Sequence, residues 1–101
     1  QVKPNSRNVV PGDVRMSVDL RNAKDATLTA MVEELKRSIV EVKKLTQTEI
    51  ALKEVVYFPP SEFAPELVAG VREGAKALGY SHRDIVSGAA HDAVYMARIA
   101  P

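Results

Sequence analysis

The sequence predicts an α+β fold, in which strands and amphipathic helices alternate along the chain. Residues 13–21 alternate between polar and apolar side chains with a period of two, which is the pattern of a half-buried strand. Residues 25–45 carry apolar side chains at three- and four-residue spacing, the pattern of an amphipathic helix, with Asp25 as the expected N-cap. Residues 48–58 are rich in Ile, Leu, Val, Tyr and Phe and precede a Pro-Pro pair, as expected for a second full strand.

The N-terminal residues predict a hairpin. Residues 4–12 are dense in turn-forming side chains, so residues 1–3 are expected to be the end of a strand that pairs with residues 13–21. The chain starts without an initiator methionine or a signal-peptide pattern, and it stops at MARIAP with no polar tail. We therefore expect the chain to be a fragment.

The second half of the chain predicts further helices. Pro65 suits a first helical turn and Gly79 suits the position after a helix end, which gives a helix over residues 65–78. Gly70 and Gly74 lie inside that helix, and each lowers its stability by about 0.8–1 kcal/mol relative to alanine. This loss predicts close packing on their face.

The last twenty residues are less regular. Residues 80–86 are expected to hold a short strand, and residues 90–99 a third helix capped by Ser87.

Composition narrows the classes of function. A chain of 101 residues suits one domain with a modest core. Its 14 basic and 13 acidic residues are interspersed, so binding to nucleic acid or to an anionic membrane is not expected. No apolar run approaches the roughly 18 residues of a membrane helix. The absence of cysteine excludes disulfides and thiolate chemistry and suits a cytoplasmic location.

Asn8 and Arg21 are candidate binding residues at the two ends of the first strand region. A guanidinium can hold a carboxylate with two parallel hydrogen bonds, and an amide can both donate to and accept from a urea-like group. The simpler interpretation is a turn-forming asparagine and a solvated arginine. Composition alone favours this simpler interpretation, and nothing in the local sequence overturns it.

His91 and Asp92 form a second candidate group, as a base with its orienting partner or as metal ligands. Adjacent residues on a helix point about 100° apart, and His82 is nine residues away, so a self-contained metal site is not expected. Residues 87–90 are instead expected to bring backbone N–H groups to a helix start, where an anionic group can bind. Alternatively, these small residues only allow tight packing.

Two separated motifs resemble those of the hydantoinase/carbamoylase family of amidases: NVVPGDVRMSVDLR at residues 8–21 and SGAAHDA at residues 87–93. That family comprises N-carbamoyl-L-amino-acid hydrolases, β-ureidopropionases and allantoate amidohydrolases, within a larger clan of co-catalytic zinc peptidases. The resemblance extends over residues 4–101. Ala90 departs from the commoner SGAGHDA form, in which glycine stands at this position, and alanine is compatible there with a backbone contact at negative φ.

The resemblance implies a two-domain, usually homodimeric hydrolase that cleaves the carbamoyl C–N bond of N-carbamoyl-L-amino acids or related ureido acids. Residues 1–60 would be the later half of a lid or dimerisation domain, an antiparallel sheet with helices on one face. Residues 61–101 would be a helical piece of an α/β zinc-peptidase-like catalytic domain. Two divalent metal ions (Zn, Mn, Co or Ni) activate a water in such enzymes, and a glutamate acts as general base. Their ligands lie outside this chain, so it should be inactive alone.

The resemblance also assigns roles to individual residues. Asn8 and Arg21 would both project from the lid domain, often across the dimer, to bind the substrate. Arg21 would hold the substrate carboxylate bidentately, Asn8 would hydrogen-bond the polar end of the substrate, and the Gly88 backbone would contact the substrate. The expected supporting residues are Ser87, Ala90 and His91. No catalytic residue and no metal ligand is expected within the chain.

One alternative has no enzymatic role. The chain would then be a stand-alone dimerisation or interaction module, with the helix at residues 25–45 and the strand at residues 13–21 as its binding surface.

Overall fold

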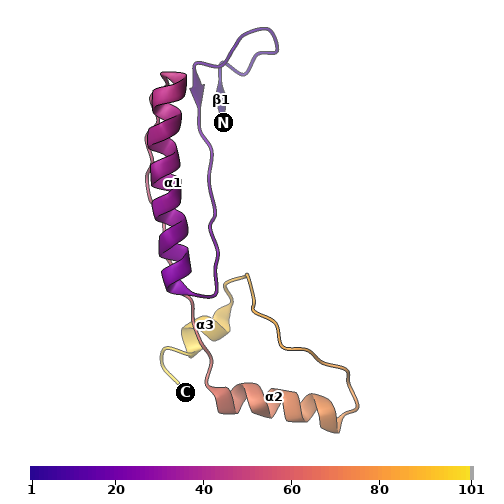
Figure 1. Cartoon of the computed structure of the whole chain (residues 1–101). Coiled ribbons are helices and arrows are strands. Elements are labelled where there is room, and N and C mark those ends of the chain that lie inside the picture. Colours follow the sequence, from indigo (N-terminus) through magenta and orange to yellow (C-terminus); the bar gives the residue numbers. More distant parts are fainter. Residues whose placement is uncertain (101) are drawn as a thin grey trace.

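The computed structural model describes residues 1–100 and combines helices with one small sheet in an elongated arrangement of 62 × 30 × 24 Å (Figure 1). The elements are β1 (Val2–Lys3), β2 (Asp13–Val14), α1 (Asp25–Thr46), α2 (Pro65–Ala77) and α3 (Asp92–Met96). An antiparallel pair of strands together with helices agrees with the predicted α+β class.

The predicted hairpin is confirmed, but it is short. β1 and β2 are antiparallel, with Val2 opposite Val14 and Lys3 opposite Asp13. The predicted strand over residues 13–21 is wrong beyond Val14, because a strand exists only where a neighbour completes its hydrogen-bond ladder. The partner strand β1 has just two residues. Beyond Arg15, which exchanges two backbone hydrogen bonds with Gln1, the chain continues along α1 without forming a ladder (Figure 1).

α1 matches the predicted helix closely. It begins at Asp25, which stands in the first turn, while Lys24 holds the N-cap position without a side-chain cap, so the expected Asp25 cap is wrong. The acidic first turn still complements the positive end of the helix dipole. At the other end Gln47 adopts a left-handed conformation with φ of 54°, and its N–H donates to the carbonyl oxygen of Lys43 at 3.0 Å.

The described residues form almost no shared core. Leu28, on α1, is 7% exposed and is the one buried apolar side chain among residues 1–100. Large apolar side chains elsewhere face solvent, such as Met16 at 79% and Val55 at 88% exposure. Within residues 1–100, β1 and β2 are the only pair of elements in contact, so the expected layer of helices against a sheet face does not form.

α2 confirms the predicted second helix and its ends. Pro65 occupies the first turn, and Gly79 follows the helix with φ of 73°, a conformation that glycine adopts without strain. The predicted close packing at Gly70 and Gly74 is wrong for this chain. A Cβ built at either position meets no atom within 4 Å in the part of the chain that the structure describes.

The last predicted elements are also corrected. Residues 48–58 and 80–86 form no strand within the described chain, because no neighbouring segment pairs with them. α3 is shorter than the predicted helix over residues 90–99, and its N-cap position is held by His91, not by Ser87. Beyond Met96 the chain continues in turns, and Pro101 lies outside the described residues.

Candidate functional site

Arg21 lies in the extended segment that leads into α1, and Asp19 binds it there. The Arg21 Nε donates to Oδ1 of Asp19 at 3.0 Å, and Nη2 donates to Oδ2 at 2.5 Å. Both side chains remain more than half exposed. The hydrogen bond from Arg21 lowers the pKa of Asp19, and the same bond raises the pKa of Arg21. Asp19 therefore stays ionised at neutral pH.

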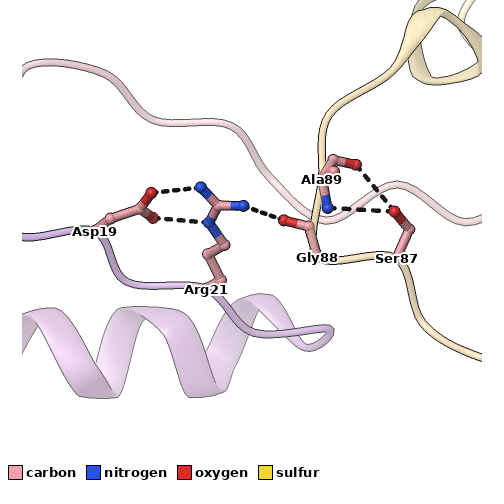
Figure 2. Close-up of polar contacts among 5 residues, drawn as sticks. All are labelled: Asp19, Arg21, Ser87, Gly88 and Ala89. Atoms are coloured by element: carbon pink, nitrogen blue, oxygen red, sulfur yellow. Dashed lines mark hydrogen bonds and ion pairs between the residues drawn. The ribbon is translucent and has the colours of Figure 1, made fainter.

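The Arg21 guanidinium also reaches Gly88, which lies 67 residues later in the chain. Its Nη1 donates to the Gly88 carbonyl oxygen, on the side opposite to Asp19 (Figure 2). Beside it, the Ser87 hydroxyl accepts from the Ala89 N–H and donates to the Ala89 carbonyl, both at 3.2 Å. Ser87 is therefore held in a local turn, upstream of the N-cap position of α3, and does not cap that helix. The structure thus brings together two predicted binding residues, Arg21 and Gly88.

Asn8, the third predicted binding residue, lies elsewhere. It belongs to the loop between β1 and β2, where its N–H donates to the Ser6 hydroxyl at 3.5 Å. That loop lies beyond the C-terminal end of α1, whereas the chain at Arg21 lies by its N-terminal end (Figure 1). α1 has 22 residues and is therefore about 33 Å long. Within one chain, Asn8 and Arg21 do not meet at one site.

The predicted supporting residues surround the start of α3. The His91 ring stacks on the Phe63 ring, with centroids 5.9 Å apart and planes at 24°. Ala90 fits its position without strain, because within residues 1–100 the residues with φ in the left-handed region are Gln47 and Gly79. The alanine that departs from the family motif is thus compatible with the local backbone. The helix begins at Asp92, so the N–H groups of residues 88–90 precede it and are not part of its first turn.

The described residues do not fit the divalent metal ions that the resemblance implies. No three side chains of His, Cys, Asp or Glu gather in residues 1–100 in a way that could hold an ion. A metal site needs three or four such ligands. No chemical step through a metal is therefore assigned to this chain. Nor does any helix in this range have the length and apolar character needed to cross a membrane.

An apolar-walled groove of about 250 Å³ lies away from the predicted site, between α2 and residues 82–84. An ion pair between Arg72 and Asp84, with Nη2 and Oδ2 2.5 Å apart, ties the two segments together. The hydrogen bond from Arg72 lowers the pKa of Asp84. None of the predicted binding residues lines this groove, so we place the candidate site at Arg21 and Gly88.

Comparison with known proteins identifies related sequences. The chain is 41% identical over 98 residues to an N-carbamoyl-L-amino-acid amidohydrolase of Rhizobium meliloti, a match covering 97% of this chain and 24% of the relative. It is 35% identical over 98 residues to a protein of the same name from Paenarthrobacter aurescens, with the same coverage. The chain is homologous to these amidohydrolases. An allantoate amidohydrolase of Bacillus subtilis is 29% identical over 99 residues, covering 98% of the chain and 24% of that protein.

These comparisons confirm the family resemblance carried by the two motifs. The chain spans about a quarter (24%) of the length of the amidohydrolase relatives that it matches. No family model matches the sequence, and no solved structure matches it. The relationship to amidohydrolases therefore rests on pairwise sequence similarity over these 98–99 residues and on the motifs within them.

The residue that sequence reasoning did not single out is Asp19. A signal for it was present, because the period-two pattern places Asp19 and Arg21 on the same polar face. The pattern does not indicate that Arg21 also binds the carbonyl oxygen of Gly88.

Proposed function

We propose that the chain is part of a metal-dependent amidohydrolase that hydrolyses the carbamoyl C–N bond of N-carbamoyl-L-amino acids or related ureido acids. In this proposal the chain supplies substrate-binding residues. The observation that carries it is the hydrogen bond between Arg21 and Gly88, because this bond joins the two motifs at one point. The names of the similar proteins, N-carbamoyl-L-amino-acid amidohydrolase and allantoate amidohydrolase, support the substrate class.

Arg21 is the proposed receptor for the substrate carboxylate. Its planar, permanently charged guanidinium offers N–H groups in a fork that matches the two oxygens of a carboxylate. Gly88 holds the SGAAHDA turn against this group, where a side chain would meet nothing within 4 Å in the described chain. The turn backbone therefore stays accessible to a small molecule bound at Arg21.

Asn8 takes part in the proposal through a second copy of the chain. Since α1 separates it from Arg21 within one chain, a homodimer is needed for Asn8 to reach the polar end of the same substrate. We further propose that residues 1–60 belong to the lid or dimerisation domain of a cytoplasmic enzyme, and residues 61–101 to its zinc-peptidase-like catalytic domain. The divalent metal ions are held by residues that this chain does not contain.

The test is Arg21→Lys in the complete protein encoded around these residues, assayed with N-carbamoyl-L-alanine. Lysine keeps the charge but cannot form the planar fork, so we expect KM to rise about 10-fold or more while the protein stays folded. Arg15→Lys is the matched control, because Arg15 lies in the same extended segment, where its backbone N–H donates to Gln1. An unchanged KM for Arg21→Lys would remove Arg21 from substrate binding.

The exposed apolar side chains, such as Met16 and Val55, also suit the interaction-module alternative. An assay of the complete protein distinguishes the two functions. A complete protein that self-associates but hydrolyses no N-carbamoyl amino acid, with Mn, Co or Zn added, would favour the module.

A further inference from the structure

Two of the three sides of the Arg21 guanidinium are already occupied. Asp19 accepts from Nε and Nη2 along one edge, and the Gly88 carbonyl accepts from Nη1 on the other side (Figure 2). These contacts use three of the five N–H groups that an arginine carries. The two remaining N–H groups are one on Nη1 and one on Nη2.

The remaining N–H groups form the outer edge of the guanidinium. Among residues 1–100, no acceptor besides Asp19 and the Gly88 carbonyl contacts Arg21. An edge with one N–H on each terminal nitrogen presents two parallel donors, which is the arrangement that a carboxylate accepts bidentately. Asp19 and an incoming carboxylate therefore need not compete for the same donors.

We propose that Asp19 is a positioning residue, which fixes the guanidinium so that its Nη1–Nη2 edge is presented to the carboxylate of the substrate. This inference rests on the proposed function, because it takes Arg21 to be the carboxylate receptor. A free arginine side chain loses rotational freedom when it binds, and a guanidinium already held on two sides has less to lose. The lowered pKa of Asp19 keeps its carboxylate ionised, and thus bound to Arg21, at the pH of the assay.

The opposite role for Asp19 makes the opposite prediction. If its carboxylate occupied the place of the substrate, it would compete with the substrate and raise KM in the wild-type protein. Removing its charge would then lower KM. The sign of the change in KM upon mutation therefore distinguishes a positioning residue from an internal competitor.

The experiment uses Asp19→Asn in the complete protein, with steady-state kinetics on N-carbamoyl-L-alanine. Asparagine has nearly the same shape, but it lacks the charge and has one oxygen acceptor in place of two. We expect KM to rise about 10-fold, with kcat within about twofold, because orientation of the bound carboxylate is lost while the chemistry is retained. Asp19→Glu, which restores a carboxylate, should give an intermediate KM.

Two further variants keep the interpretation specific. Asp13→Asn removes a carboxylate from β2, and Asp13 has no ion pair within residues 1–100, so the KM of this variant should match the wild-type value. In an Arg21→Lys background, Asp19→Asn should add less than about twofold, because the two residues act as one unit. A KM that falls or stays unchanged in Asp19→Asn would overturn the positioning role. If Arg21→Lys also left KM unchanged, the proposed function itself would fail.

Discussion

Replacing Gly70 and Gly74 by alanine tests whether α2 stands free in this chain. Both glycines lie inside the 13-residue helix, and a Cβ at either site meets open space in the described structure. With no steric penalty, each substitution removes only the conformational freedom of glycine from the unfolded chain. Each should therefore stabilise the helix by about 0.8–1 kcal/mol, and the pair by about 1.6–2 kcal/mol if the sites are additive.

The assay is backbone hydrogen exchange of the 101-residue chain, resolved by residue. A gain of 1.6–2 kcal/mol corresponds to roughly 15- to 30-fold slower exchange of amides inside α2, at one factor of ten per 1.4 kcal/mol. Amides of α1 provide an internal reference, because no contact joins the two helices. Exchange in α1 should not change.

Gly79→Ala is the matched control for the same helix. Gly79 has φ of 73°, where a Cβ is strained, so this substitution should destabilise the helix end by about 1–2 kcal/mol. Faster exchange in α2 after Gly70→Ala and Gly74→Ala would refute the open-face reasoning. It would show that another surface packs closely against these glycines, as their positions in the sequence had suggested.

Two other predictions use the same chain. The carboxyl of Asp84 should titrate below its ordinary pKa of 3.8 in a carbon NMR titration, and return toward that value in Arg72→Gln. Because the folded-state pKa is the lower one, the stabilisation from this pair is present above the ordinary value and is lost as pH falls through the folded value. A midpoint unaffected by Arg72→Gln would mean that the pair does not form in solution. The chain alone should hydrolyse no N-carbamoyl-L-alanine with Mn, Co or Zn added, and metal-dependent turnover would contradict the assignment of the metal ligands to other residues.

Helices were the part of the fold that the sequence predicted well. Their determinants are local: the spacing of apolar residues in α1, and Pro65 and Gly79 at the ends of α2. The predicted strands failed where they needed a partner from elsewhere. Residues 15–21 and 48–58 have suitable side chains, yet neither finds a neighbouring ladder in this chain.

For the candidate site, too, the sequence indicates the local contacts but not the distant ones. The alternation of residues 13–21 contained a signal for the pair of Asp19 and Arg21, which stand two residues apart in its polar set, although sequence reasoning did not single out Asp19. The contact with Gly88 depends on how the chain turns after α1 and α2, which no local pattern contains. The separation of Asn8 from Arg21 likewise follows from the length of α1. The hairpin loop that contains Asn8 lies beyond the C-terminal end of α1, and Arg21 precedes its N-terminal end.

The bond between Arg21 and Gly88 has a consequence for the order in which the chain folds. α1 needs only contacts between close neighbours in sequence, so it can form early. Closing a 67-residue separation to bring Gly88 to Arg21 requires much more chain entropy to be lost, and a single exposed hydrogen bond returns little of it. We therefore expect this closure to be among the last events of folding and among the first to reverse. A ligand that binds both motifs should therefore slow the opening of the loop between Arg21 and Gly88.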